Sequence, residues 1–269
     1  MPRDLTSFVK EDALSDMSPL GRSEQHQDQQ PTQQDPPGSQ DEPPMMFRDS
    51  IQAKGNQERD ELHPYTQTLT LSDVDSCVIL EEAAFPPHER ATKEKFRYRL
   101  GKCSELSLGI FTSHEGTDIP TAATSQPVYS GAPHRKAVLL GHIVATKTTN
   151  AIVSDSDMAL PSDDPANPAL GNKQEGRTVA IHSLAVLPQF QRKGLGSTLL
   201  KAYLDRLAKQ DVADRAALIA HEDMIPYYEK FGFKNRGKSA AQFGGGGWFD
   251  MVKEVTLEDE GDGLIWSRR

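Results

Sequence analysis

The sequence has few cysteines, no long apolar run and no excess of positive charge. Two cysteines, Cys77 and Cys103, cannot build a disulfide framework, so we expect two reduced thiols. No apolar run approaches the length needed to cross a bilayer, and the first residues lack the apolar core of a signal peptide. We therefore expect a soluble, cytoplasmic protein without a membrane partner.

The negative charge is unevenly distributed. The formal net charge is −9 at pH 7, and residues 1–60 hold twelve acidic against six basic residues, a net of −6. This segment is rich in Gln, Pro, Asp and Ser and cannot bury enough apolar surface to fold. We predict a disordered tail over 1–60, a folded domain over 61–257 and an acidic-to-basic tail over 258–269. Polar stretches at 113–135 and 150–176 are expected to be surface insertions in the domain.

The rest of the domain alternates between helical and strand patterns. Apolar residues at helical spacing and apolar or β-branched runs follow one another along the chain. Such an alternation predicts an α/β or α+β protein built on a sheet. Helices are expected at 73–85, 93–103, 195–207 and 224–231, and strands at 105–111, 137–148, 178–187, 216–220 and 248–255.

The turn between the strand 178–187 and the leucine-rich helix carries glycines at Gly194 and Gly196. Glycine lets the backbone approach a ligand closely, and the amides at a helix N-terminus attract phosphate groups. Arg192 and Lys193 add positive charge beside them. The turn therefore suits an anionic ligand.

Two common nucleotide-binding motifs do not fit this turn. A P-loop requires a lysine directly after its last glycine, but Gly196 is followed by Ser197. A dinucleotide-binding fold requires a third glycine at position 199, where Leu199 stands, and its turn belongs to the first β-α unit of the chain. Both classes are excluded.

The segment 191–196, Gln-Arg-Lys-Gly-Leu-Gly, resembles the acetyl-coenzyme A loop of the GNAT superfamily of N-acetyltransferases. Within that superfamily, the segments 103–111, 182–186 and 221–233 resemble arylalkylamine (serotonin) N-acetyltransferases of the fungal type. The resemblance covers about residues 65–255. It implies a twisted, mixed and mostly antiparallel sheet flanked by helices and splayed at the coenzyme site. It also implies acetyl-CoA as cosubstrate and no metal.

The resemblance implies acetyl transfer from acetyl-CoA to a primary amine such as serotonin, tryptamine or phenylethylamine, by direct attack in a ternary complex. An alkylamine has a pKa of about 10 and arrives protonated, so a base must remove a proton before attack. His182 is the candidate base, and Tyr228 matches the tyrosine that acts as acid on the leaving sulfur. The family carries a further histidine where this chain has Ala180, so the role of base falls on His182 alone.

The resemblance also assigns binding residues. The amide of Leu184 is expected to polarise the acetyl carbonyl, the strand beside it to pair with the pantetheine arm, and the loop after it to hold the pyrophosphate. The coenzyme residues are Leu184, Ala185, Val186, Gln191, Arg192, Lys193, Gly194, Leu195, Gly196 and Ser197. The amine pocket is expected to be formed by Phe85, Pro87, Thr146, Ile181, Ile219 and Trp248.

Two other functions remain open. The same fold can acetylate a polyamine or a protein lysine, and a polyamine site would be lined with carboxylates. A non-catalytic acyl-CoA sensor would be recognised by loss of the base and acid positions. We expect a monomer with a small-molecule amine, and no nucleic acid, as its partner. The carboxylates available for a polyamine, which the sequence cannot orient, are Glu81, Glu82, Glu89, Glu222 and Asp223.

Overall fold

The computed structural model describes residues 54, 61–128, 131–132, 134–162 and 170–255. The predicted tails, 1–60 and 258–269, lie outside the described residues except for Lys54. The chain divides into two units, Met1–Glu42 and Pro43–Arg269, and every described residue belongs to the second. In the described ranges, no helix is long and apolar enough to cross a membrane.

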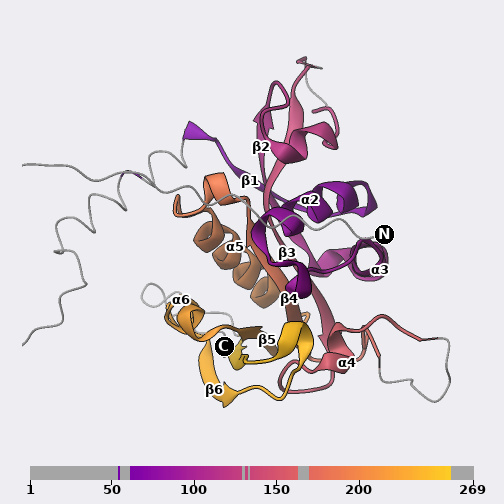
Figure 1. The fold of residues 1–269 in the computed structure, drawn as a ribbon, viewed down its shortest axis with the longest axis vertical. Coiled ribbons are helices and arrows are strands. Elements are labelled where there is room, and N and C mark those ends of the chain that lie inside the picture. Colours follow the sequence, from indigo (N-terminus) through magenta and orange to yellow (C-terminus); the bar gives the residue numbers. More distant parts are fainter. Residues whose placement is uncertain (1–53, 55–60, 129–130, 133, 163–169, 256–269) are drawn as a thin grey trace, which may run out of the picture. The chain divides into compact units, whose positions relative to one another are not determined.

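A mixed sheet of seven described strands forms the centre of the domain (Figure 1). Only the pair β4 and β5 is parallel, and the other neighbouring pairs are antiparallel. This confirms the predicted fold class, a mixed and mostly antiparallel sheet with flanking helices. The order across the sheet is β1 (Tyr65–Thr68), β2 (Leu108–His114), β3 (Lys136–Thr148), β4 (Thr178–Val186), β5 (Arg215–Ala220), β7 (Phe249–Glu254) and β6 (Lys234–Lys238).

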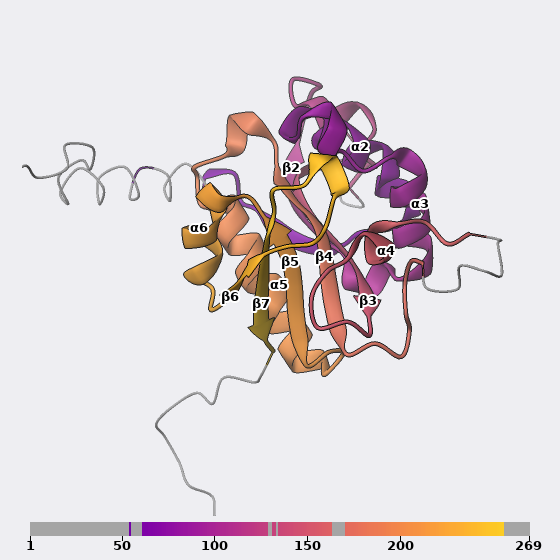
Figure 2. The ribbon, with the colours of Figure 1, turned by 60° about the horizontal axis from the view of Figure 1, so that its bottom comes forward.

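Helices cover both faces of the sheet (Figures 1 and 2). The long helix α5 (Leu195–Gln210) packs on β2, β3 and β4 from one side, and α2 (Val74–Ala84) and α3 (Lys93–Lys102) lie on the other. Of the two short helices, α6 (Ile225–Glu229) contacts β6 and β7, and α4 (Asp155–Met158) contacts β3 (Figure 2). The predicted apolar face of α5 is confirmed, because its side chains at helical spacing are all buried. They are Leu195, Leu199, Leu200, Tyr203, Leu204 and Leu207.

The two polar stretches are not only surface loops. In the first, the 3-10 turn Pro120–Ala123 packs against α2 and β3, and Ile119 and Ala122 are buried in the core. Thr121 Oγ1 donates a hydrogen bond to the carbonyl oxygen of Leu139 at 2.6 Å. In the second, Met158 is buried in the smaller core cluster. Isolated apolar side chains within polar runs therefore contribute to the core, which composition alone concealed.

Two short strands were not predicted. The sequences of β1, YTQT, and β6, KNRGK, are mostly polar and give no alternating pattern. Both strands lie at the edges of the sheet, where only one side is hydrogen-bonded and the side chains are largely exposed. An edge strand needs little apolar burial, and so hydropathy does not reveal it.

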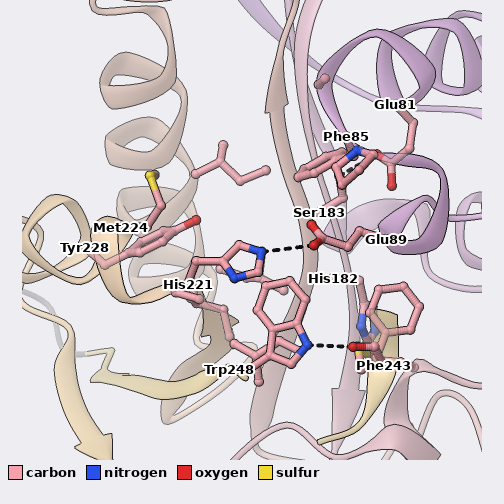
Figure 3. A pocket seen from close by; sticks show the side chains of 18 residues that line it. Glu81, Phe85, Glu89, His182, Ser183, His221, Met224, Tyr228, Phe243 and Trp248 are labelled. Atoms are coloured by element: carbon pink, nitrogen blue, oxygen red, sulfur yellow. Dashed lines mark hydrogen bonds and ion pairs between the residues drawn. The ribbon is translucent and has the colours of Figure 1, made fainter. Parts of the chain in front are cut away.

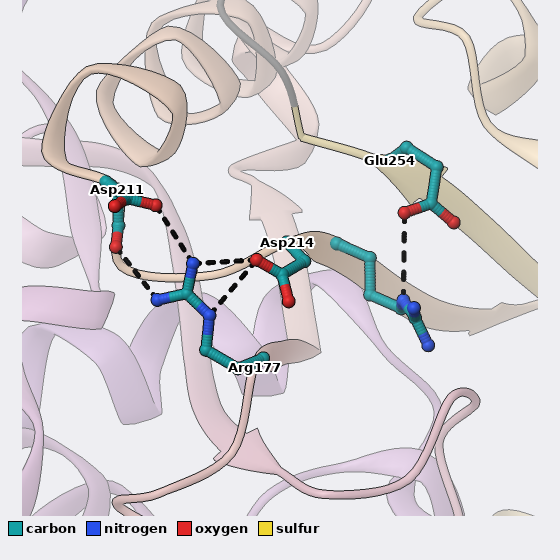
Figure 4. Close-up of polar contacts among 5 residues, drawn as sticks. Arg177, Asp211, Asp214 and Glu254 are labelled. Atoms are coloured by element: carbon teal, nitrogen blue, oxygen red, sulfur yellow. Dashed lines mark hydrogen bonds and ion pairs between the residues drawn. The ribbon is translucent and has the colours of Figure 1, made fainter.

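An ion-pair cluster closes one end of the β4–β5 pair (Figure 4). Arg177, directly before β4, contacts Asp214 Oδ1 at 2.7 Å and Asp211 Oδ1 at 2.9 Å through Nη2. The N–H of Asp214 donates to the carbonyl oxygen of Arg177 at 2.8 Å. These contacts tie the loop that follows α5 to the start of β4, at the end where the two parallel strands are paired.

Both cysteines are free, as predicted, and both are buried. Burial raises the pKa of Cys103 to about 12 and holds the pKa of Cys77 well above its ordinary value. Neither residue therefore supplies a thiolate nucleophile at neutral pH.

The core assignment predicts that Leu199→Ala lowers the free energy of unfolding by about 2–5 kcal/mol, because it leaves a cavity under α5. The exposed neighbour Lys201→Ala should change it by no more than about 0.5 kcal/mol. Urea unfolding followed by circular dichroism measures both. A loss below about 1 kcal/mol for the leucine variant would contradict this account of the core.

Candidate functional site

Strands β4 and β5 are paired over only part of their length. Their pairing runs from Thr178↔Arg215 to Ala180↔Ala217 and ends there. Beyond Ala180, β5 stays paired with β7 while β4 stays paired with β3. The sheet therefore opens between β4 and β5, as the fold prediction required.

The open edge of β4 presents backbone groups. The N–H of Leu187 donates to the carbonyl oxygen of Leu140, at the β3 side. Because backbone groups alternate sides along a strand, those of Leu184 and Val186 face the opening. The carbonyl of Val186 accepts a hydrogen bond from Gln191 Nε2 at 2.9 Å. The N–H groups of Leu184 and Val186 lie at an edge that is not paired with β5.

His182 occupies a β-bulge in β4. The register with β3 passes from Val144↔Ser183 to Ala145↔Ile181, so His182 has no partner across the ladder. Its Nε2 lies 2.7 Å from Thr146 Oγ1, and its buried Nδ1 has no hydrogen-bond partner among the described residues. With the proton on Nε2, Nδ1 offers a free lone pair.

The environment keeps His182 neutral. Burial is the main cause that holds the pKa of His182 well below its ordinary value, and the positive charges of Arg99 and Lys95 add to the effect. A histidine with a lowered pKa is uncharged at neutral pH, so the lone pair on its unprotonated ring nitrogen is available over the whole physiological range.

A cavity of about 370 Å³ lies in the opening between β4 and β5 (Figure 3). Apolar and aromatic side chains form most of its wall, and its polar groups come from two glutamates, two histidines, a serine and a tyrosine. The lining residues are Glu81, Ala84, Phe85, Pro86, Glu89, Met158, Ile181, His182, Ser183, Leu184, Leu218, Ile219, Ala220, His221, Met224, Tyr228, Phe243 and Trp248.

Tyr228 reaches the cavity from α6, opposite β4 (Figure 3). Burial, and to a lesser degree Tyr227, raises the pKa of Tyr228 far above its ordinary value, so the phenol stays protonated and is a hydrogen-bond donor. Tyr227 instead packs against Tyr228 and Phe231, with ring centroids 5.2 Å apart in each case. The two neighbouring tyrosines therefore differ in role, and the predicted one lines the cavity.

The glycine-containing turn leaves the start of α5 open. Gly194 is the N-cap residue with φ +79°, and no side chain caps the helix there. Arg192 also has a positive φ of +60°. The first-turn amides of a helix have no partner within the helix, and the helix dipole adds positive potential. This arrangement suits a phosphate group.

The other residues of the turn differ in their contacts with the rest of the domain. A Cβ at Gly196 would lie 3.3 Å from the Tyr227 hydroxyl, so a larger residue would crowd this wall. Lys193 lies over the Phe190 ring at 5.8 Å. The side chain of Leu195 is buried in the core, so only its backbone is available to a ligand. Burial raises the pKa of Tyr227, and a hydrogen bond with Ser197 partly offsets the rise.

The structure brings together four of the six predicted amine-pocket residues: Phe85, Ile181, Ile219 and Trp248 line the cavity. Thr146 lies behind His182 and contacts it without lining the cavity. Pro87 begins the turn Pro87–Glu89 and does not line the cavity, whereas Pro86 and Glu89 do.

A buried network that sequence reasoning did not find ties α2 to the sheet. Ser183 Oγ donates to Glu81 Oε2 at 2.8 Å, and His142 Nε2 lies 3.2 Å from that oxygen and 2.9 Å from Ser183 Oγ. The N–H of Ala91 donates to Glu81 Oε1 at 2.9 Å. The network fixes the end of α2, from which Phe85 enters the cavity. Its members are far apart in sequence, so no local pattern joins them.

A second group of cavity-lining side chains consists of Glu89, His221, Phe243 and Trp248. His221 Nε2 lies 3.1 Å from Glu89 Oε1, and the His221 ring stacks on Trp248 at 4.0 Å between centroids (Figure 3). Trp248 Nε1 donates to the carbonyl oxygen of Phe243 at 2.6 Å. The glycine-rich segment between these aromatic residues packs on Glu89, because a Cβ at Gly244 would lie 2.9 Å from Glu89 Cγ.

The second polar stretch anchors this wall. Asp155 accepts hydrogen bonds from the backbone N–H groups of Gln242, at 2.9 Å, and Phe243, at 3.0 Å. Met158, from the same stretch, lines the cavity. Lys95 of α3 lies 4.9 Å above the Phe243 ring. A segment whose composition predicts a surface insertion thus contributes to the site.

Comparison with known proteins assigns the class of the domain. Residues 139–255, from within β3 to just past β7, match a family described as an acetyltransferase (GNAT) domain. The predicted resemblance to the GNAT superfamily is confirmed over this part of the chain.

Two of the curated relatives are serotonin N-acetyltransferases. The chain is 44% identical to the serotonin N-acetyltransferase of Mesocricetus auratus over 69 residues, or 26% of this chain and 33% of that protein. It is 36% identical to the Homo sapiens enzyme of that name over 73 residues, or 27% and 35% of the two chains. The match thus spans about a third of the length of these relatives. Among solved structures, the loading GNATL domain of CurA from Lyngbya majuscula aligns with a TM-score of 0.49 and 12% identity, covering 71% of this chain and 98% of that one.

The buried network predicts an acid-sensitive stability. Burial by itself would raise the pKa of Glu81, but hydrogen bonds with His142, Ala91 and Ser183 outweigh it and lower the pKa. A lowered carboxyl pKa stabilises the fold fully above the unfolded value of about 4.3 and ceases to do so as pH falls through the folded value. We expect Glu81→Gln to cost about 1–3 kcal/mol at pH 7 and to flatten the loss of stability below about pH 4.

Denaturant unfolding between neutral and acidic pH measures this effect. The exposed carboxylate of Glu82, next in the sequence, provides the matched control Glu82→Gln, which should follow the unmodified protein. An unchanged acid dependence in the Glu81 variant would show that the network does not depend on the charge of Glu81.

Proposed function

We propose that the protein transfers the acetyl group of acetyl-CoA to the primary amine of an arylalkylamine. The observation that carries the proposal is the opening beside β4, which combines an unpaired strand edge, a cavity with His182 and Tyr228 on facing walls, and an uncapped helix start. The match to the GNAT acetyltransferase domain and to serotonin N-acetyltransferases supports it.

The residues present fit acetyl-CoA. The open edge of β4 at Leu184 to Val186 can hydrogen-bond the amide groups of the pantetheine arm as a further strand would. The turn from Gln191 to Ser197 offers helix amides and the cationic side chains of Arg192 and Lys193, which suit a pyrophosphate. Acetyl-CoA supplies the acetyl group as a thioester, and no metal is part of the proposal.

The proposed chemistry follows from three groups of the chain. His182 accepts a proton from the amine, directly or through water, so that the nitrogen can attack with its lone pair. The N–H of Leu184 stabilises the negative charge that develops on the acetyl oxygen. Tyr228, held protonated, donates to the sulfur as the C–S bond breaks. The proposal thus gives the amine proton to His182, the acetyl oxygen to the N–H of Leu184 and the leaving sulfur to Tyr228.

Two observations favour this reaction over its alternatives. A coenzyme sensor would not need the base and acid positions, whereas His182 and Tyr228 both line one cavity. A polyamine site would carry several open carboxylates, but of the five candidates only Glu81 and Glu89 line the cavity, and Glu81 is engaged by its network. Phe85, Phe243 and Trp248 give the wall an aromatic character that suits an arylalkyl group.

The proposal is tested by measuring thiol release from acetyl-CoA with tryptamine, phenylethylamine, spermine and a lysine peptide. We expect turnover with the first two amines and little with the others. Faster turnover of spermine or of the peptide would show that the acceptor is a polyamine or a protein lysine instead. Tight coenzyme binding without turnover of any amine would exclude an acetyltransferase.

The role of His182 predicts a specific pH dependence. His182→Ala should lower kcat/KM by about a hundredfold near neutral pH, where the amine is protonated, and recover toward high pH, where free amine is abundant. Because the pKa of His182 is lowered, protonation of this residue should reduce the activity of the unmodified protein only well below pH 6.5.

The control is His134→Ala, a largely exposed histidine that pairs with Glu115 and does not line the cavity. Steady-state rates across pH for the three proteins measure the effect. A loss in His182→Ala that is equal at every pH would assign His182 a structural role.

A further inference from the structure

We infer that Glu89, held by His221, is the anionic group that recognises the charged amine and so determines the substrate class as monoamines with one cationic nitrogen. This inference rests on the proposed function and deepens it by naming the residue that selects the acceptor. From the sequence, Glu89 is only one of five carboxylates available to a polyamine, and His221 has no assigned role.

The carboxylate of Glu89 has one oxygen that is held in place and one that can accept a hydrogen bond from a ligand. Its side chain is only 11% exposed, and it ends the short 3-10 turn Pro87–Glu89. Its contacts with His221 Nε2, at 3.1 Å, and with His88 Nε2, at 3.5 Å, both involve Oε1. Within the described residues, no hydrogen bond reaches Oε2. One carboxylate oxygen is therefore fixed and the other is available to an incoming N–H donor.

The support around Glu89 is rigid. The ring of His221 is stacked on Trp248 with 29° between the planes, and Trp248 is tied to Phe243 through its indole N–H. Behind the turn, Arg90 donates to the carbonyl oxygens of Phe85 and Glu82, each at 2.7 Å. A carboxylate held in one place binds a cation at a smaller entropic cost than a mobile side chain does.

The charge of the cavity fits a cation. No lysine or arginine is among the residues that line it, and its two carboxylates are Glu81 and Glu89. Glu81 already accepts hydrogen bonds on both oxygens. Partial burial strengthens the attraction between a carboxylate and an ammonium group relative to the attraction in water. Only one carboxylate is free to act in this way, so the cavity suits one ammonium group and an apolar body.

The test distinguishes recognition of the ammonium charge from recognition of the shape of the amine. Phenylethylamine is cationic at pH 8, whereas in 2,2-difluoro-2-phenylethylamine the fluorine atoms withdraw electrons and leave the amine largely neutral. Calorimetric titration of each amine into the CoA-loaded full-length protein measures the two affinities. We expect Glu89→Gln to weaken binding of phenylethylamine by about tenfold or more and to leave the fluorinated amine within about twofold.

Three controls accompany the variant. Glu89→Asp keeps the charge and should retain part of the preference for the cation, and Glu82→Gln removes an exposed charge outside the cavity and should bind as the unmodified protein does. Unchanged CoA affinity in Glu89→Gln verifies that the variant is folded.

Equal weakening of both amines, or weakening of neither, would overturn the inference, as would an unmodified protein without a preference for the cation. The proposed function fails separately. Glu89-dependent binding of phenylethylamine without thiol release would support the recognition site and reject the transferase. Normal turnover and affinity in Glu89→Gln would support the transferase and reject the recognition site.

Discussion

The end of pairing between β4 and β5 at Ala180 is the constraint on which the site depends. Parallel strands that stayed paired would bury the backbone of Leu184 to Val186 in the sheet and leave no cavity. The two strands are held at one end by Arg177 and its aspartates and separate at the other, where each keeps its second neighbour. The opening therefore removes only part of the hydrogen bonding between β4 and β5. It leaves backbone groups of β4 unpaired by β5 inside the domain.

The polar groups around the opening have distinct environments. On one wall, burial and nearby cations keep His182 neutral, and on another, burial keeps Tyr228 protonated. Glu81 is held ionised by its own hydrogen bonds. A cavity in which a free base, a proton donor and a carboxylate coexist is suited to moving a proton away from an amine and toward a leaving group.

Much of the fold could be predicted from the sequence, because β4 and α5 have clear apolar periods and the turn at Gly194 has a distinctive composition. The edge strands β1 and β6 could not, since polar edge strands bury few side chains. Ile181, His182 and Leu184 follow one another along the segment that carries the family motif, and all three line the cavity. The contact between Glu89 and His221 could not be predicted, because 132 residues separate the two and only the folding of the sheet brings them together. The same holds for Glu81 and Ser183, which are 102 residues apart.

The central claim is that the open edge of β4 binds the coenzyme through its backbone. Amide hydrogen exchange, resolved at Leu184 and Val186 and measured with and without CoA, tests it most directly. The account predicts that both amides exchange more slowly once CoA is bound, while amides of the outer strand β1 are unaffected. Unchanged exchange at Leu184 and Val186, in a protein that calorimetry shows to be saturated with CoA, would contradict it.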